Sequence, residues 1–261
     1  MSQLKKIFIT AIEKRKNALT KFDCLRILDG AGDGAPGIII EKFGKIAIAH
    51  LFEEQGNWEI VDLKELTWSQ AKIESVYVRV RTKSKITELE TEASLIFGEP
   101  VQEIIINEQG LELFIRPERV TNGGLFIDTR EVRKFIFENS KDKKVLNTFC
   151  YTGSLGLASF VGGAKEVTQI DSNKGILNWA RENFELNKKS GFGLVKHIQE
   201  DTISFIKKEV KRIAKGTKDP YDIVILDPPT FGRSEKGVFK IEKDLGSLLL
   251  ASKDLLSEKS I

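Results

Sequence analysis

The segment Val145-Leu-Asn-Thr-Phe-Cys-Tyr-Thr-Gly-Ser154 decides the fold of this 261-residue chain. A short apolar strand runs into a turn that ends in Gly153-Ser154, and a helix is expected to follow. Acidic residues follow three further apolar strands, namely Asp171, Asp201 and the first residue of Asp227-Pro-Pro229. Because the carboxyl ends of parallel strands meet at one edge of a sheet, this layout predicts a nucleotide-cofactor site along that edge.

From about residue 121 the sequence alternates between helical and strand-like periodicity. The expected helices are 128–139, 154–161, 174–188, 201–214 and 243–256, and the expected strands are 143–148, 166–171, 194–199 and 222–226. Four strands joined by crossover helices predict the α/β class, with a doubly wound, Rossmann-like parallel sheet. Ser260-Ile261 resembles the start of another strand, so we expect the sheet to need at least two more C-terminal strands.

The first part of the chain has a different pattern, dominated by hairpins. An amphipathic helix is expected at 3–19, and strands 38–40 and 46–48 flank Gly44, which we expect to take a positive φ. Further expected elements are a helix at 57–71 and strands at 76–80, 104–106 and 111–115. We therefore predict a small α+β accessory domain over residues 1–120 and a cofactor-binding domain over residues 121–261.

Composition excludes some classes of protein. The net charge of +3 is divided unevenly, at −2 over residues 1–120 and +5 over residues 121–261, so any nucleic-acid surface must be a local patch. No apolar run approaches the roughly 18 residues that span a bilayer. Cys24 and Cys150 form neither a disulfide framework nor a metal spacing. We expect a cytoplasmic protein without a metal site.

The turn after the first strand of the second domain distinguishes between cofactors. It contains neither Gly-x-Gly-x-x-Gly nor Gly-Lys-Ser/Thr, the sequences that hold phosphates. A cofactor with adenosine but no phosphate fits better, and S-adenosyl-L-methionine is the obvious one. Gly153 would let the ligand approach the backbone, and Ser154 is expected to cap the following helix.

Each acidic residue has a functional and a structural interpretation. Asp171 could accept both ribose hydroxyls, or it could cap the next helix. Asp201 could accept from the adenine amino group, or it could cap its own helix. We expect Asp227 to be buried and the two prolines after it to fix a rigid loop that positions a substrate base.

Two further segments have candidate roles. In Gly123-Gly-Leu-Phe-Ile-Asp-Thr-Arg130, Phe126 could wall the methionine end of the cofactor, and Asp128 and Arg130 could meet its charged groups; the alternative is a turn with Asp128 as a helix cap. In the strand after Val78, the cations Arg79, Arg81, Lys83 and Lys85 would share one face suited to RNA phosphates. The alternative there is a solvated edge that deters strand pairing.

Together these segments resemble the class I S-adenosylmethionine-dependent methyltransferases. More narrowly, the chain resembles the ribosomal RNA large-subunit methyltransferases that modify cytosine at carbon 5 or guanine at nitrogen 7. The resemblance covers residue 24 to the end and rests on Gly30 to Gly37, Glu41 to Gly44, Gly123 to Arg130, Val145 to Ser154, Gly162 to Lys165, Ile170-Asp171, Trp179 to Asn183, Asn187, Asp201 and Leu226 to Phe231.

The resemblance implies roles for individual residues. Asp227, Pro228 and Pro229 would face the target base and form the catalytic loop. The cofactor would be held by Phe126, Asp128, Arg130, Asn147, Phe149, Tyr151, Thr152, Gly153, Ser154, Asp171, Ser172, Asp201, Thr202 and Asp227. The first domain would help to dock RNA, and the enzyme would act as a monomer or homodimer, away from membranes.

The chain also departs from this family. The nucleophilic cysteine of the carbon-5 enzymes would lie beyond Ile261, and Cys150, in the cofactor turn, is expected to be a packing residue. Relatives that methylate amino groups have an aromatic residue directly after the proline pair, whereas here Thr230 precedes Phe231. Methylation of a small molecule or a protein, and a non-catalytic RNA-binding role, therefore stay as alternatives.

Overall fold

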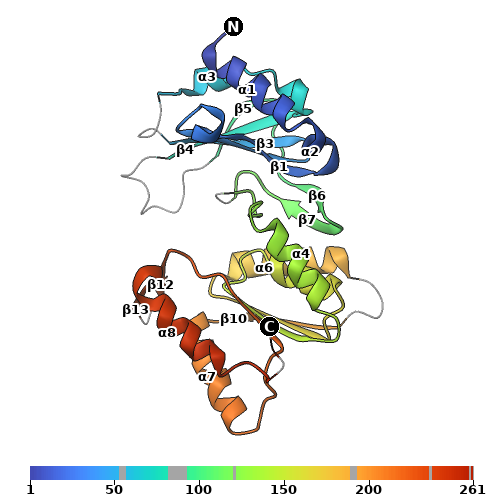
Figure 1. Ribbon diagram of the computed structural model, residues 1–261, viewed down its shortest axis with the longest axis vertical. Coiled ribbons are helices and arrows are strands. Elements are labelled where there is room, and N and C mark those ends of the chain that lie inside the picture. Colours follow the sequence, from blue (N-terminus) through green and yellow to red (C-terminus); the bar gives the residue numbers. More distant parts are fainter. Residues whose placement is uncertain are drawn as a thin grey trace. The chain divides into compact units, whose positions relative to one another are not determined.

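The computed structural model describes residues 1–52, 57–81, 93–119, 122–188, 193–234, 237–258 and 260. The chain divides into two compact units, Met1–Asp128 and Thr129–Ile261. Figure 1 shows the helices and strands of both.

The division falls eight residues later than the expected one at residue 120, because the segment around Gly123 packs on the first unit. The Arg116 N–H donates to the Gly123 carbonyl at 3.0 Å. A Cβ on Gly123 would lie 3.0 Å from side-chain atoms of both Ile115 and Ile48. Glycine therefore allows this connecting segment to lie close against the first unit.

The first unit is built on an antiparallel sheet with one parallel pair. Within its described residues the strand order is β1-β2-β3-β4-β5, with β3 and β4 parallel, and β6 and β7 form a separate antiparallel pair. Its elements are α1 (Gln3–Lys14), α2 (Lys16–Lys21), β1 (Cys24–Asp29), η1 (Gly30–Asp33), β2 (Ile38–Phe43), β3 (Ile46–Phe52), α3 (Ile60–Lys64), η2 (Trp68–Ala71), β4 (Ser75–Arg81), β5 (Ser94–Phe97), β6 (Ile104–Glu108) and β7 (Leu111–Ile115).

The core of this unit lies between α1 and one face of the sheet. Apolar side chains at helical spacing, such as Leu4 and Phe8, are buried against the strands, and the Phe8 and Trp68 rings meet edge to face at 5.2 Å. Figure 1 shows α1 and α3 over the same face of the sheet. The expected β2–β3 hairpin is confirmed, with Gly44 at φ 54°.

Both helices expected in this unit are shorter than predicted. The helix expected at 3–19 is interrupted at Arg15, which leaves helical geometry (φ −103°, ψ 9°). Its guanidinium pairs with Asp33 at 2.7 Å. The helix expected at 57–71 begins only at Ile60, where Glu59 and Asp62 form a capping box, and it ends at Lys64.

The second unit has the expected doubly wound fold. Its described main sheet has the order β10-β9-β8-β11, and every pair in it is parallel. Its elements are α4 (Arg130–Asn139), β8 (Lys144–Thr148), α5 (Ser154–Val161), β9 (Glu166–Asp171), α6 (Lys174–Asn187), β10 (Leu194–Gln199), α7 (Thr202–Ala214), β11 (Ile223–Leu226), β12 (Phe231–Ser234), β13 (Gly237–Lys240) and α8 (Ile241–Lys253).

Helices cover both faces of this sheet. α7 and α8 lie side by side (Figure 1) and pack Phe205 and Leu248 against Leu146 and Ile170 of the strands. On the other face, α5 and α6 contact the strands, and α4 packs on α5. β8 and β11 are neighbours in the sheet. The chain leaves β8 toward α5 on one face and leaves β11 toward α8 on the other face. The carboxyl ends of these two strands therefore form the switch point at which such folds bind ligands.

Two features near the end of the chain differ from expectation. The antiparallel hairpin β12–β13 was not predicted, and it precedes α8. Strand-like pairing after α8 begins at Leu256 rather than at Ser260, because Tyr221 donates its N–H to Leu255 and accepts from the Ser257 N–H, both at 2.8 Å.

Gly162 is a sensitive packing position of the second unit. A Cβ at Gly162 would lie 2.3 Å from the Phe137 carbonyl oxygen, so we expect Gly162→Ala to lower the free energy of unfolding by about 1–3 kcal/mol. At Gly246, inside α8, a Cβ would meet nothing within 4 Å. Gly246→Ala should therefore raise stability by about 0.5–1 kcal/mol. Urea unfolding of both variants tests this, and equal effects would contradict the packing described.

His197 should make stability depend on pH. Burial and then the nearby Arg181 lower the pKa of His197 to about 4, although Glu185 opposes the shift. The folded chain therefore binds fewer protons than the unfolded one. We expect stability to be complete above about pH 6.5 and to fall by about 1–2 kcal/mol toward pH 4, after allowing for solvent screening. Denaturation of His197→Gln at pH 7.5 and pH 5 should show a smaller loss than wild type.

Candidate active site

The turn between β8 and α5 has an unusual backbone. Phe149, Tyr151 and Gly153 all lie in the left-handed region, at φ 50°, 52° and 84°. For bulky residues this conformation costs about 1–3 kcal/mol each, and it persists only where the surroundings impose it. Here the Tyr151 N–H donates to Asp171 Oδ2 at 3.0 Å, so the carboxylate at the end of β9 holds the turn.

Asp171 has the properties of a ligand acceptor. Its other oxygen, Oδ1, accepts from the Asn173 N–H at 2.9 Å, and the side chain lines a cavity. Burial raises the pKa of Asp171 above its ordinary value, although backbone donors from Asn173 and Tyr151 oppose the shift. The ionised carboxylate is therefore poorly solvated, and further hydrogen-bond donors entering the cavity would stabilise it.

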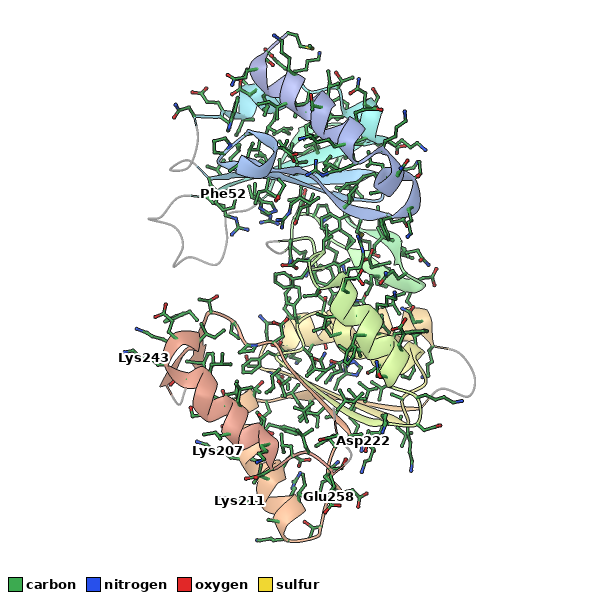
Figure 2. The ribbon with its side chains drawn as sticks, viewed as in Figure 1. Phe52, Lys207, Lys211, Asp222, Lys243 and Glu258 are labelled. Atoms are coloured by element: carbon green, nitrogen blue, oxygen red, sulfur yellow. The ribbon has the colours of Figure 1, made fainter. Side chains whose placement is uncertain are left out.

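The cavity has a volume of about 420 Å³ and lies within the second unit. The ends of β8 and β9 form one wall, the first turns of α7 a second, and the loop after β11, the β12–β13 hairpin and α8 a third. Its lining residues are Phe149, Asp171, Ser172, Asp201, Thr202, Ile203, Ser204, Ile206, Lys207, Pro229, Gly232, Phe239, Asp244, Ser247, Leu248 and Ala251. Figure 2 shows Lys207 on α7 and Lys243 on α8.

Several of the predicted residues meet at this cavity. They are Phe149, Asp171, Ser172, Asp201, Thr202 and Pro229. Asp201 also caps α7, since its Oδ1 accepts from the Ser204 N–H at 2.9 Å and the Ser204 hydroxyl at 2.7 Å. The structural interpretation of Asp201 is therefore correct, and its position on the cavity wall leaves the functional one open.

The other residues discussed from the predicted turn do not line the cavity. Asn147 is fully buried and donates from Nδ2 to Gln169 Oε1 at 2.7 Å, and Thr152 is also fully buried. Neither side chain has surface to offer a ligand, so they support the sheet and the turn. The N-cap of α5 is Gly153 rather than Ser154. A Cβ at Gly153 would lie 3.0 Å from Ala180 Cβ, and close packing on α6 thus requires glycine there.

The Asp227-Pro-Pro229 loop leaves the carboxyl end of β11. Asp227 is exposed, contrary to our expectation, because β11 ends at Leu226 and the next residue emerges at the rim of the sheet. Pro228 is half-buried, and Pro229 lines the cavity. The loop therefore presents a carboxylate to solvent beside the cavity.

The three candidates Phe126, Asp128 and Arg130 do not line the cavity. Phe126, 47% exposed, and Asp128 belong to the first unit, whereas Arg130 begins α4 of the second. Thr129 rather than Asp128 occupies the N-cap of α4. The roles predicted for these residues toward the cofactor stay predictions.

The prediction that Arg79, Arg81, Lys83 and Lys85 share one exposed face is wrong for Arg79. Arg79 is buried, at 4% exposure, and donates to the Pro117 carbonyl at 2.8 Å. Arg81 is half-buried, with a guanidinium nitrogen 3.4 Å from His50 Nδ1. β4 lies between β3 and β5, so it is not an edge strand and Arg79 is not free for phosphates. Lys83 and Lys85 lie outside the described residues.

Sequence reasoning missed the hairpin of the third wall and the lining residues that α8 contributes to it. Phe239 comes from the unpredicted hairpin, and Asp244, Ser247 and Leu248 come from α8. The available signal was Ser234-Glu-Lys-Gly237, a turn-type sequence directly before the apolar pair Val238-Phe239. Cys150 fits its predicted packing role, since burial, followed by the charge of Asp171, raises the pKa of its thiol well above the usual range.

Two features are absent from the part of the chain that the structure describes. There, no helix combines the length and apolar character needed to cross a membrane. Nor do three or more histidine, cysteine or acidic side chains gather in a way that could hold a metal ion within those residues.

The fold and the cavity define a domain that binds a nucleotide-type cofactor at the switch point of a parallel sheet. Residues 58–259 match the family model described as S-adenosylmethionine-dependent methyltransferase. The chain belongs to this family, which confirms the predicted family resemblance and the predicted fold class.

Known relatives agree with this assignment. Ribosomal RNA large subunit methyltransferase K/L of Pseudoalteromonas translucida is 32% identical over 209 residues, which are 78% of this chain and 28% of the relative. The chain thus spans about a quarter of that protein. The crystal structure of SMU.776 complexed with SAH matches 97% of this chain and 64% of its own, with a TM-score of 0.79 and 24% identity. The methyltransferase from Agrobacterium tumefaciens matches 86% and 68%, with a TM-score of 0.67 and 22% identity.

Asp171 should matter for cofactor binding beyond its structural role. In Asp171→Asn, one acceptor oxygen becomes an NH2 group, so the carboxylate expected to accept from ribose is lost and one of the two backbone donors, Tyr151 N–H or Asn173 N–H, loses its acceptor. We expect the affinity for S-adenosylhomocysteine to fall at least about tenfold, with a stability loss of about 1–2 kcal/mol. Calorimetric titration and thermal unfolding measure the two effects.

The matched control is Asn173→Ala, which removes the side-chain cap on the Ile176 N–H of α6. It should cost about 1 kcal/mol of stability. Asn173 does not line the cavity, so cofactor affinity should be retained. An equal loss of affinity in both variants would reduce Asp171 to a structural residue.

Proposed function

We propose that this protein transfers a methyl group from S-adenosylmethionine to a base of RNA, most specifically ribosomal RNA. Family membership supports the donor, and the similarity over 78% of the chain to a ribosomal RNA large subunit methyltransferase supports the substrate class. The single structural observation that carries the proposal is the cavity at the switch point. There, Asp171 and Asp201 stand beside the loop that contains Asp227.

The residues that line the cavity fit the proposed donor. A volume of about 420 Å³ is within the range of small-molecule sites. Asp171, whose burial leaves its carboxylate poorly solvated and raises its pKa, would accept from both ribose hydroxyls, and Asp201 with Thr202, which line the same cavity, would meet the adenine edge. Phe149, Ile203 and Phe239 supply apolar surface for the ring. The first turn contains no phosphate-binding sequence, which agrees with a cofactor without phosphate.

The chemistry depends mainly on positioning. When bound, S-adenosylmethionine would supply an electrophilic methyl group for in-line transfer to a base nitrogen or carbon, with S-adenosylhomocysteine as the leaving group and loss of a proton from the base. Pro228 and Pro229 fix the backbone of the loop, and Asp227 would hold the extruded target base by accepting a hydrogen bond from it. Such alignment alone lowers the barrier substantially by removing the entropy cost of bringing the two reactants together.

Other parts of the proposal concern the setting of the reaction. The first unit would help to dock RNA, although Arg79 contributes to its core instead. The enzyme would act in the cytoplasm, as a monomer or homodimer. The methyl-transfer experiment described below also distinguishes two alternatives. One is methylation of a small molecule or protein, and the other is a non-catalytic RNA-binding role.

Replacing Asp227 tests the proposal. We expect Asp227→Asn to reduce transfer of labelled methyl groups to ribosomal RNA at least about 100-fold, with S-adenosylhomocysteine affinity changed less than about threefold. Nucleoside analysis of the labelled RNA identifies the base. The control Asp219→Asn changes an exposed carboxylate that pairs with Lys144 at 2.9 Å, before β11, and should retain activity.

The alternatives give different results. Cofactor binding without label in RNA, but with label in protein or small molecules, would replace the proposed substrate. Absence of cofactor binding by the wild-type protein would favour the non-catalytic role. Normal turnover in Asp227→Asn would remove the loop from the mechanism.

A further inference from the structure

The β12–β13 hairpin has two faces of different character. Its register pairs Gly232 with Phe239 and Phe231 with Lys240. Gly232 and Phe239 line the cavity, and Phe239 is 8% exposed. Because successive residues of a strand point to opposite faces, Phe231 and Lys240 project from the outer face. Both are exposed, Phe231 at 48%.

This outer face begins at the rim of the cavity. Phe231 lies two residues after Pro229, which lines the cavity, and a Cβ on Gly232 would be 3.5 Å from Pro229 Cγ. The hairpin therefore packs directly on the loop that contains Asp227. Anything held on the Phe231 ring would lie next to the place proposed for the target base.

A second cation adjoins the hairpin. Lys243 is exposed in the first turn of α8, and Figure 2 shows it at that end of the helix. Asp244, Ser247 and Leu248 of α8 line the cavity. Successive residues of a helix are rotated by about 100° around its axis, so Lys243 projects beside the cavity-facing side of α8 rather than into the cavity.

Among the described residues, the two acids in the first turn of α8 do not offset these cations at the surface. By the same helical spacing, Glu242 points to the opposite side of α8 from the cavity. Asp244 Oδ2 accepts from the Lys240 backbone N–H at 2.7 Å. Phe231, Lys240 and Lys243 thus place an aromatic ring and two ammonium groups on the exposed strip beside the cavity, as far as the described residues show.

We propose that Phe231, Lys240 and Lys243, here called the hairpin surface, bind single-stranded RNA next to the target base. An exposed ring on which a base stacks, beside cations that meet phosphates, is the chemistry that recognises single strands. A nucleotide flanking the target would stack on Phe231, and its phosphates would meet Lys240 and Lys243. This inference rests on the RNA substrate proposed above and adds the surface that holds it.

The test compares variants in two assays. One is the anisotropy of a labelled 12-nucleotide single-stranded RNA, and the other is the KM for ribosomal RNA in methyl transfer. We expect Phe231→Ala to weaken binding and raise KM about 5- to 100-fold, and Phe231→Trp to restore both. Lys243→Gln should reduce the slope of log affinity against log salt by about 0.7. The control Lys253→Gln, exposed in the last turn of α8, should behave as wild type.

Further measurements separate this role from a structural one. Thermal unfolding, S-adenosylhomocysteine affinity and kcat should be unchanged in Phe231→Ala, since the ring is half exposed and lies outside the cavity. If the wild type methylates RNA, and Phe231→Ala and Lys243→Gln both keep its KM, RNA affinity and salt dependence, the hairpin surface is overturned and the proposed function stands. If the wild type transfers no methyl group to RNA, the proposed function fails. The anisotropy assay alone then decides whether the hairpin surface binds single-stranded RNA. Self-association that is lost in Phe231→Ala, with RNA affinity unchanged, would assign the surface to a second copy instead.

Discussion

The hydrogen bond from the Tyr151 N–H to Asp171 is the interaction on which the site depends. It joins the turn after β8 to the end of β9 and compensates for two bulky residues in left-handed backbone conformations. The same carboxylate lines the cavity, so one side chain sets the shape of the turn and offers an acceptor to a ligand. Strain and function therefore meet at a single residue, as expected where a site must be organised before its ligand arrives.

Much of the second unit could be predicted from sequence because its signals are local. The period of apolar residues identifies each strand and helix, and the acidic residues at strand ends identify the edge of the sheet where Asp171 and Asp201 meet. The capping role of Asp201 also follows from its place before α7, whereas the helix that Asp171 was expected to cap has Asn173 as its N-cap. These predictions held because neighbouring residues determine them, and the parallel topology then brings them together in space.

The remaining features depend on partners that are distant in sequence. Arg79 resembles an exposed cation until β5 pairs beside its strand and the Pro117 carbonyl accepts from its guanidinium. Asn147 resembles a ligand residue because it stands near the turn, yet it bonds to Gln169 across the sheet. The short β12–β13 hairpin has too few residues for its period to stand out, although it supplies Phe239 to the cavity. In each case tertiary packing rather than local propensity decides the outcome.

Backbone hydrogen bonds join α8, which belongs to the third wall of the cavity, and the residues just after it to the residues on either side of β11. At the start of α8, Ile241 donates to the Thr230 carbonyl in the loop that follows this strand, at 3.1 Å. Beyond the helix, Leu255 and Ser257 bond to Tyr221, two residues before the strand begins. The cavity wall and the Asp227-Pro-Pro229 loop are consequently held by the same strand, so a shift of β11 would move the wall and the loop together and preserve their mutual alignment.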